Sequence, residues 1–332
     1  MRGFEGQDVT VTTKIKAEAE AGRRGQFRTT LNLVHTGSAD LSIRYELAGP
    51  EDAPLLLVAG GISAGRHVVA NAYDPTDGWW EAQANTFRPC RLLSIDWLGA
   101  DGTVDRPIDS SDQAQALLAT LDHLGLPGAA AFVGASYGAM VGMHCARLAP
   151  DRVPALLAIS AAHRSHPFTS AQRALQRQAI ELGERLGSPE SGVALARKLA
   201  ILTYRTPEEF AERFATPSAL EGDRVRASSE PYLDHMGDKH SARMTAAVYR
   251  RLSESIDLHR VDPAAIAVPA TFVAVDSDQL VPADDIEALA NAVPSARFVI
   301  VPSLYGHDAF LKEERAIAAI INDFLNSLEQ PQ

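Results

Sequence analysis

Ser136 lies in the string Val-Gly-Ala-Ser-Tyr-Gly (133–138), directly after an apolar run and directly before a helix-like stretch. A serine between two glycines at this spacing, at a strand–turn–helix junction, is typical of a nucleophile elbow. Ordinary side chains two residues to either side would collide in such a strained turn, and Gly134 and Gly138 remove those collisions. The pattern predicts a nucleophilic serine, against the alternative of a tight turn without chemistry.

A serine hydroxyl is a poor nucleophile near neutral pH, so it needs a base, and the base needs a carboxylate that orients it. In an elbow architecture these partners follow the serine in the order acid, then histidine, each after a late strand. His307 follows the apolar run Phe298–Pro302, and Asp278 follows Thr271–Val275. We therefore predict His307 as the base and Asp278 as the acid, with Asp276 as a second candidate for the acid.

Acyl chemistry at a serine also needs two backbone N–H groups that stabilise the oxyanion. The amide of Tyr137, next after the serine, is the first expected donor. The second is expected from the Gly-rich loop 59–63, where Gly61 and Ile62 are the candidates. The sequence leaves open which amide of this loop donates, and a plain tight turn is the alternative.

The elements that must position these residues alternate between short apolar runs and helical stretches, which predicts an α/β fold with a mostly parallel, doubly wound sheet. The expected strands are an antiparallel pair, Phe27–Val34 and Leu41–Leu47, and six short, fully buried strands at Leu55–Val58, Arg91–Ile95, Ala130–Val133, Ala155–Ile159, Ala270–Val275 and Arg297–Val301. The expected helices are Asp112–Leu124, capped by Ser111 or Asp112, Ala139–Leu148, Ala283–Ala292, opened by Pro282, and Glu313–Leu328.

Between residues 165 and 262 the alternation stops, and the pattern is helical without a clear strand, as in Ala171–Leu186, Gly192–Tyr204 and Ser241–Ser255. We interpret this segment as a helical lid inserted over the carboxyl edge of the sheet. The core is then formed by residues 26–164 and 263–332. Residues 1–25 are interpreted as a flexible leader.

The formal net charge of −11 argues against a nucleic-acid or anionic-membrane partner, because such surfaces need clustered Lys and Arg. No signal-peptide pattern is present, and no run approaches the roughly 18 apolar residues of a membrane span. We therefore expect a cytoplasmic protein with small-molecule substrates.

Two cysteines, Cys90 and Cys145, cannot build a disulfide framework and are expected to be buried, reduced thiols. His163 and His166 have no Cys or carboxylate at ligand spacing, which argues against a metal site. The loop 99–102 lacks the residues of a phosphate-binding or dinucleotide-binding motif. We expect no metal and no permanently bound cofactor.

Several strings together resemble the homoserine O-acyltransferases of the α/β-hydrolase superfamily, from about residue 40 to 328. They are Gly-Ala-Ser-Tyr-Gly (134–138), Ser-Asp-Gln-Leu-Val-Pro (277–282), Tyr-Gly-His-Asp-Ala-Phe-Leu (305–311), the segment 196–205 and the segment 229–233. The string around His307 is more specific than the serine elbow, which many hydrolases share. The resemblance implies an α/β-hydrolase fold with a lid, and a ping-pong reaction in which acyl-CoA, the co-substrate, acylates the serine and an amino-acid hydroxyl accepts the acyl group in methionine biosynthesis.

The resemblance also implies roles for individual residues. Ser136, Asp278 and His307 match the family's triad, and Arg197 and Tyr204 match positions that contact the amino acid. Asp308 matches a carboxylate that holds its ammonium group. An α-amino acid needs a cation and an anion of this kind. The alternative without function is that Arg197 is a solvent-exposed helix residue and that Asp308 caps a loop.

The loops 60–68 and 96–103 resemble the shorter branch of the family, which uses succinyl-CoA. The extra carboxylate of that donor needs an arginine, for which Arg66 is the candidate, with Arg164 behind it. Homoserine succinylation is the expected activity; homoserine acetylation, acylation of serine and a plain serine esterase remain alternatives. Family resemblance further implies a homodimer formed through the inserted helices.

Overall fold

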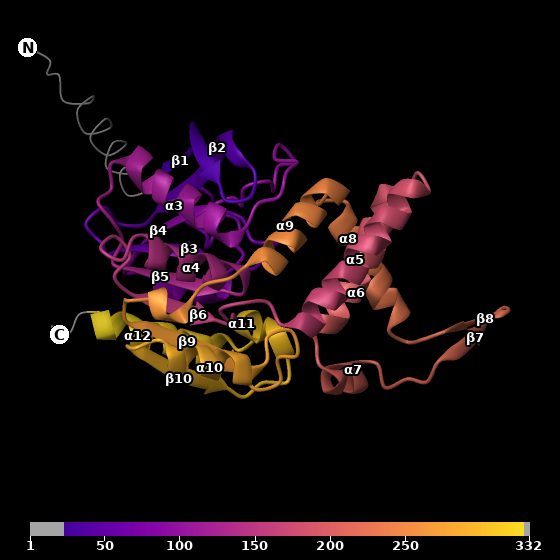
Figure 1. Cartoon of the computed structure of the whole chain (residues 1–332). Helices are drawn as coiled ribbons and strands as arrows, with labels where there is room; N and C mark the ends of the chain where they lie inside the picture. The colour runs from indigo at the N-terminus through magenta and orange to yellow at the C-terminus, as the bar shows by residue number, and fades with distance from the viewer. Residues whose placement is uncertain (1–22, 329–332) are drawn as a thin grey trace, which may run out of the picture.

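The computed structural model describes residues 23–328. Its centre is an eight-stranded sheet in the order β1-β2-β4-β3-β5-β6-β9-β10 (Figure 1). The strands are β1 (Arg23–Leu33), β2 (Gly37–Ala48), β3 (Leu55–Ala59), β4 (Arg91–Ile95), β5 (Ala131–Ala135), β6 (Leu156–Ile159), β9 (Ala270–Val275) and β10 (Ala296–Val301). β2 pairs antiparallel with both β1 and β4, and all other neighbours are parallel. The predicted doubly wound α/β fold is confirmed.

The central strands are buried on both faces, as expected for parallel strands covered by helices. β10 departs from the expectation of a fully buried strand. It is the edge strand beside β9, and Ile300 is 52% exposed. Because an edge strand has only one neighbour, part of its surface stays in water.

Helices cover the two faces of the sheet. α3 (Ser110–Leu124), α4 (Tyr137–Leu148) and α10 (Ala283–Ala292) pack into one apolar core, and α2 (Ala84–Phe87) and α12 (Glu314–Leu328) pack into the other. Cys90 and Cys145 are both free and buried within these cores. The helix α3 is capped by Asp109 rather than by Ser111 or Asp112; Asp112 instead closes a capping box by accepting from the Asp109 N–H.

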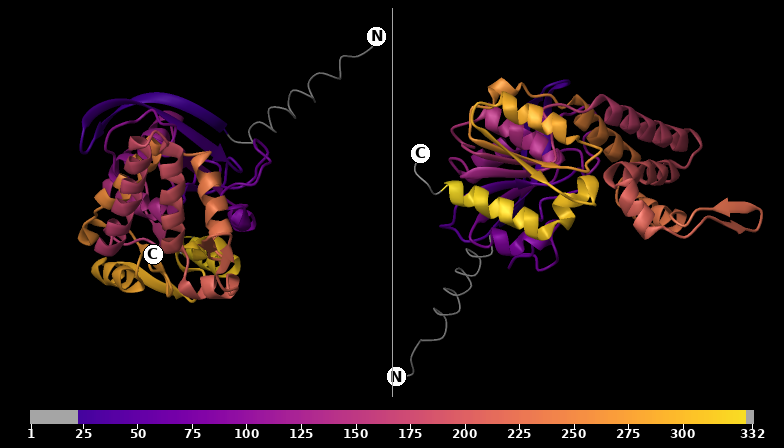
Figure 2. Two further views of the ribbon diagram at one scale, coloured as in Figure 1. Left: turned by 90° about the vertical axis from the view of Figure 1, so that its right-hand side faces the viewer. Right: turned by 90° about the horizontal axis from the view of Figure 1, so that it is seen from below.

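The segment after β6 forms a helical layer that projects from the core (Figures 1 and 2). It contains α5 (Pro167–Arg185), α6 (Pro189–Tyr204), α7 (Pro207–Arg213), α8 (Glu230–Ser241) and α9 (Ala246–Leu258). Two expectations for this segment are wrong. It does contain strands, because β7 (Ala219–Glu221) and β8 (Arg224–Arg226) pair as an exposed hairpin. The helix expected over Ser241–Ser255 is interrupted before Thr245, which caps α9.

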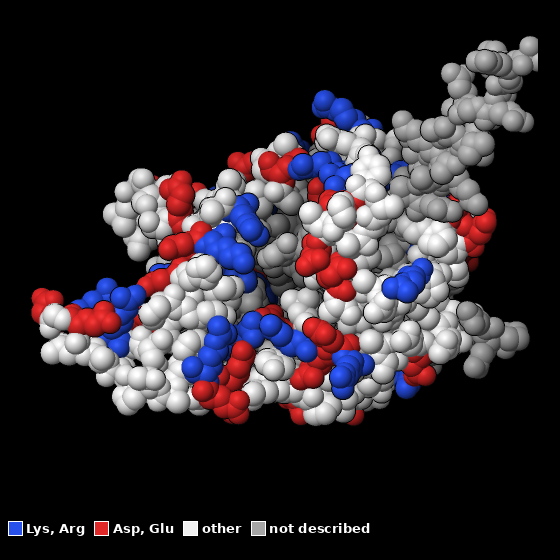
Figure 3. Space-filling model, turned by 180° about the vertical axis from the view of Figure 1, so that it is seen from behind, with Lys and Arg blue, Asp and Glu red and all other residues white. Residues whose placement is uncertain are grey.

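The predicted leader, residues 1–25, lies mostly outside the described residues, but residues 23–25 belong to β1, so the boundary at 25 is wrong. Within residues 23–328, no helix is long and apolar enough to cross a membrane. Acidic and basic side chains are mixed over the face shown in Figure 3, where Lys and Arg gather beside a hollow between the projecting helices and the core.

Candidate active site

Ser136 sits at the turn between β5 and α4, with φ 53° and ψ −122°, a backbone conformation that L-residues rarely adopt. The two glycines of the motif make this turn possible. A Cβ on Gly138 would lie 2.1 Å from the Ala59 carbonyl oxygen, and a Cβ on Gly134 would lie 2.6 Å from the Gly138 carbonyl oxygen. The predicted strand–turn–helix context of the serine is therefore present.

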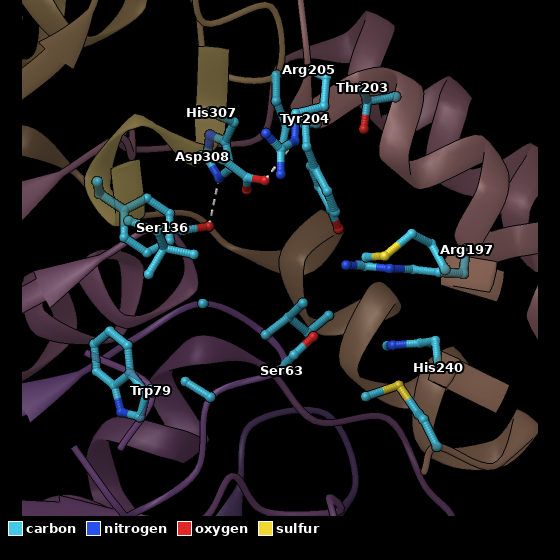
Figure 4. A pocket seen from close by; sticks show the side chains of 18 of the residues that line it. Ser63, Trp79, Ser136, Arg197, Thr203, Tyr204, Arg205, His240, His307 and Asp308 are labelled. Atoms are coloured by element: carbon cyan, nitrogen blue, oxygen red, sulfur yellow. Dashed lines mark hydrogen bonds and ion pairs between the residues drawn. The ribbon is translucent and has the colours of Figure 1, made fainter. Parts of the chain in front are cut away.

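Three side chains from distant parts of the chain form one hydrogen-bonded line, of which Figure 4 shows the contact between Ser136 and His307. The Ser136 Oγ is 2.8 Å from the Nε2 of His307, and the His307 Nδ1 is 2.7 Å from the Oδ2 of Asp278. His307 lies in the short helix η3 (Gly306–Asp308) after β10, and Asp278 follows β9. This is the geometry in which a carboxylate orients an imidazole toward a hydroxyl.

The two aspartates that competed for the acid position have different surroundings. The second carboxylate oxygen of Asp278 accepts hydrogen bonds from the N–H groups of Leu280, at 2.8 Å, and Val281, at 3.0 Å. Asp276 is exposed and accepts a hydrogen bond from the Ser303 N–H instead. Of the two aspartates, Asp278 is therefore the one that contacts His307.

His307 is buried, and its environment shifts its affinity for protons in opposing directions. Burial lowers the pKa of the imidazole, while the charge and hydrogen bond of Asp278 raise it, and the balance is a pKa above the usual 6.5. The positive charge of Arg173 acts in the lowering direction. A raised pKa suits an imidazole that must collect a proton from a serine hydroxyl.

Of the expected oxyanion donors, Tyr137 follows Ser136 in the chain, and Gly61 and Ile62 line the same cavity as Ser136. Tyr137 begins α4, so its N–H has no carbonyl partner within the helix. The loop of Gly61 and Ile62 is held against the elbow because the Gly138 N–H donates to the Gly60 carbonyl at 2.8 Å.

The triad opens into a cavity of about 590 Å³ between the core and the inserted helices. Arg197 and Tyr204 both line it, with the guanidinium carbon of Arg197 5.3 Å from the centroid of the Tyr204 ring. The Arg197 Nε is buried and has no hydrogen-bond partner within the described part of the chain. In Figure 4 this guanidinium points into the cavity from α6. A partly buried guanidinium without a carboxylate partner can bind an anion that enters the cavity.

Asp308 also lines the cavity, and it has a cationic neighbour. Its Oδ2 lies 3.0 Å from the Nε of Arg205, an ion pair that sequence reasoning did not find. Burial raises the pKa of the Asp308 carboxyl, and the charges of Arg205 and His307 act against that rise without cancelling it. Among the described residues, the cavity thus combines a carboxylate close to the triad with the unpaired guanidinium of Arg197.

Arg66 and Arg164, the candidates for a donor carboxylate, are not brought to the cavity. The Arg66 backbone N–H donates to Asp96, its Nε is 3.8 Å from the same carboxylate, and its side chain donates to the Gly25 carbonyl. Arg164 forms a β-bridge with Arg260 where the chain enters and leaves the inserted helices. The residues that line the cavity include neither of these two arginines.

Several cavity residues carried no sequence signal. They come from inserted helices or from the junctions between them, where neither a motif nor a strand end marks them: Arg173, Gln176, Arg205, Met236, His240 and Met244. Trp79 was expected from the sequence to pack in the core with Trp80; it stacks on Trp80 and also lines the cavity. Arg173 is the most informative, because it is a cation only 7% exposed. Within residues 23–328, no cluster of three or more His, Cys, Asp or Glu side chains is placed to hold a metal ion.

Comparison with known proteins agrees with this geometry. The family described as alpha/beta hydrolase fold matches residues 54–314. The solved structure of esterase E22 superposes with a TM-score of 0.82 at 18% identity, covering 92% of this chain and 100% of the esterase. The chain belongs to the α/β-hydrolase family.

Two curated relatives narrow the class. The homoserine O-succinyltransferase of Xanthomonas campestris pv. campestris is 47% identical, over 96% of this chain and 88% of the relative. A homoserine O-acetyltransferase of Thermus thermophilus is 35% identical, over 66% of this chain and 58% of the relative. Within the α/β hydrolases, the chain is therefore a member of the homoserine O-acyltransferase family, as the sequence motifs indicated.

Proposed function

We propose that this protein transfers the succinyl group of succinyl-CoA to the side-chain hydroxyl of L-homoserine, a step toward methionine. The observation that carries the proposal is the unpaired guanidinium of Arg197 in the same cavity as Ser136 and Asp308, among the residues that the structure describes. An amino-acid acceptor needs a partner for its carboxylate and one for its ammonium group, whereas a plain esterase needs neither. The 47% identity to a homoserine O-succinyltransferase supports the same substrates.

The proposed mechanism is ping-pong, with acyl-CoA as co-substrate and no permanently bound cofactor. His307 takes the proton of Ser136 as the oxygen attacks the thioester, and the amides of Tyr137 and of Gly61 or Ile62 stabilise the oxyanion. The thiolate of CoA leaves with the proton from the imidazolium. The homoserine hydroxyl then gives its proton to His307 and attacks the acyl-serine, and the Ser136 oxygen leaves with the proton that the imidazolium returns.

Water competes with homoserine for the acyl-serine, so the enzyme must hold the acceptor hydroxyl in place. Arg197 and Asp308 would bind the carboxylate and the ammonium group, and Tyr204 would pack beside them. This orientation gives the hydroxyl an effective concentration that water does not reach. The inserted helices, which close one side of the cavity, reduce access of water to the acyl-serine.

The free carboxylate of the succinyl group needs a cation, and we assign this role to Arg173. It lines the cavity, and its charge is close enough to affect the pKa of His307. Arg173 and Arg177 both pair with Asp257, each at 2.7 Å, so two guanidinium groups share one carboxylate. The surplus positive charge favours an anionic acyl group over an acetyl group.

Homoserine acetylation and acylation of serine remain second candidates, because they use the same triad and the same amino-acid contacts. Acetyl transfer to homoserine is the activity named for the Thermus thermophilus relative. A serine esterase is a third, since esterase E22 shares the fold. The test is a thiol-release assay that combines succinyl-CoA or acetyl-CoA with homoserine or serine. The proposal expects the fastest release with succinyl-CoA and homoserine; equal release without an acceptor would instead favour a hydrolase.

The proposal includes a cytoplasmic homodimer formed through the inserted helices. Exposed apolar side chains recur every seven residues along α5 at Phe168, Leu175 and Leu182, and a second row follows α6 at Leu195, Leu199 and Leu202. These helices pack against each other, and their exposed rows would leave much apolar surface in water on a monomer. A second copy of the chain, which presents the same rows, is the proposed partner.

A further inference from the structure

The junction of α6 and α7 contacts the turn that carries His307, residues 304–308, which we call the catalytic turn. The Thr206 hydroxyl, which caps α7, donates to the Leu304 carbonyl at 2.6 Å. A Cβ on Gly306, whose φ is +56°, would lie 2.8 Å from the Tyr204 carbonyl oxygen. The backbone of the junction therefore lies against the turn that carries His307 and leaves no room for a larger residue there.

Arg205 lies at the centre of this contact, between two carboxylates from different elements. Its NH1 donates to the Glu209 Oε1 of α7 at 2.8 Å, and its Nε is 3.0 Å from the Asp308 Oδ2. All three side chains are mostly buried, with 12% of the Arg205 side chain exposed. The contact with Glu209 is a hydrogen bond, whereas the contact with Asp308 is an ion pair in which the Nε makes no hydrogen bond. The planar guanidinium presents nitrogen atoms toward both carboxylates, which the single nitrogen of a lysine amine cannot do in the same way.

The two oxygens of Asp308 are therefore not equivalent. Arg205 occupies Oδ2, while Oδ1 has no hydrogen-bond or ion-pair partner among the described side chains. Asp308 borders the cavity. A cationic group that enters the cavity can therefore contact the Asp308 carboxylate while Arg205 holds its other oxygen.

We propose that Arg205 is a positioning residue that fixes the Asp308 carboxylate, so that its second oxygen receives the ammonium group of the acceptor amino acid. This inference rests on the proposed function, because it assumes an amino-acid acceptor. Arg205 acts through Asp308 and does not touch the acyl-serine. Arg205 also joins the inserted helices to the turn that carries His307. This contact fixes the distance between Arg197 on α6 and Asp308 on that turn, the two proposed charged partners of the acceptor.

The charge of Arg205 has a second consequence. Burial favours the protonated form of Asp308, and Arg205, His307 and Arg197 favour the carboxylate, while Glu209 favours the protonated form. These are the charged groups that affect Asp308 from its own turn and from α6 and α7. Removing Arg205 therefore raises the pKa of Asp308 further and leaves less carboxylate for the ammonium group at a given pH.

The experiment compares two acceptors in the Arg205→Met variant of the full-length protein. Homoserine carries the ammonium group, and 4-hydroxybutanoate has the same hydroxyl and carboxylate without it. We expect the KM for homoserine to rise by about tenfold or more, the size of a lost charged hydrogen bond, with a larger rise at lower pH. The KM for 4-hydroxybutanoate, or its inhibition constant against homoserine where turnover is too slow, should change by less than about threefold.

Two further variants complete the test. Arg205→Lys keeps the charge without the planar geometry and should recover part of the homoserine affinity, which also covers the case in which Arg205→Met folds poorly. Arg224→Met makes the same change at an arginine whose side chain is 77% exposed on the hairpin and should leave both acceptors unaffected. Equal losses for the two acceptors, or an unchanged KM for homoserine, would overturn the proposal. An unmodified protein with no acceptor-dependent CoA release would instead refute the proposed function itself.

Discussion

The ring of Tyr204, at the end of α6, stacks on the imidazole of His307 with centroids 6.0 Å apart and planes 28° apart. The first ring belongs to the inserted helices, and the second belongs to the catalytic turn after β10. The contact places the acceptor-side wall of the cavity directly against the proposed base. The residues proposed for the chemistry and those proposed for acceptor recognition therefore line the same cavity.

Removal of the nucleophile tests the covalent step. Ser136→Ala should abolish both product formation and the release of CoA from succinyl-CoA, because no acyl-enzyme can form. The measurement is thiol release with and without homoserine. Ser191→Ala, at an exposed serine on α6, serves as the matched control and should behave as the unmodified protein. Rapid CoA release that persists in Ser136→Ala would contradict an acyl-serine.

The raised pKa of His307 predicts the pH dependence of the reaction. The base must be neutral to accept the serine proton, so kcat/KM should increase with pH and level off above an apparent pKa higher than 6.5. Asp278→Asn removes the carboxylate that raises this pKa, so the rising limb should move to lower pH. The plateau should fall by up to about 10⁴-fold, because an amide stabilises the wrong imidazole tautomer.

Asp276→Asn is the control for this prediction, since Asp276 is two residues away and its carboxylate accepts from the Ser303 N–H rather than from His307. Its pH profile should match that of the unmodified protein, and its plateau should change only a few-fold. A larger loss in Asp276→Asn than in Asp278→Asn would reverse the assignment of the acid.

Arg197 is predicted to act on the acceptor and not on the donor. Arg197→Ala should raise the KM for homoserine by about tenfold or more, the range expected for a lost charged hydrogen bond, while the acylation burst measured without acceptor stays nearly unchanged. Lys198→Ala is a matched control, because Lys198 pairs with Asp234 and does not line the cavity. An acylation burst impaired as strongly as the acceptor reaction would show that Arg197 has another role.

Arg173 is predicted to select the donor. Arg173→Leu should lower the preference for succinyl-CoA over acetyl-CoA by about tenfold or more in kcat/KM, because a desolvated carboxylate loses its cation. Asp257 keeps Arg177 as a partner in this variant, so its charge is not left unpaired. Arg66→Leu is the comparison, since Arg66 lies outside the cavity. If Arg66→Leu changed the preference and Arg173→Leu did not, the assignment would be wrong.

The exposed rows on α5 and α6 predict the oligomeric state. Leu175→Glu combined with Leu199→Glu should convert a dimer into a monomer, because charges placed in an apolar interface resist burial. Sedimentation velocity or light scattering gives the mass directly. Leu220→Glu, on the exposed hairpin, is the control and should keep the dimer mass. An unmodified protein that is monomeric at micromolar concentration would refute the proposed interface.

Sequence patterns alone predicted the serine elbow, the positions of the other two triad residues after their strands, and the α/β fold. The glycines on either side of Ser136 identify the elbow, because only residues without a Cβ fit the close backbone approaches at that turn. The order of the strands indicates where Asp278 and His307 must lie, because the carboxyl ends of parallel strands share one edge of the sheet. The α/β fold follows from the same alternation.

Contacts between distant segments were decided only by the tertiary structure. Arg66 and Arg173 are both arginines near apolar residues, and the sequence favoured the one beside the oxyanion loop. In the folded chain Arg66 lies against Asp96. Arg173 lies in the cavity, because the packing of α5 against α6 and α9 sets which face of α5 meets the site. The pairing of Arg205 with Asp308 joins residues 103 positions apart (308 − 205), and no periodicity within either segment encodes it.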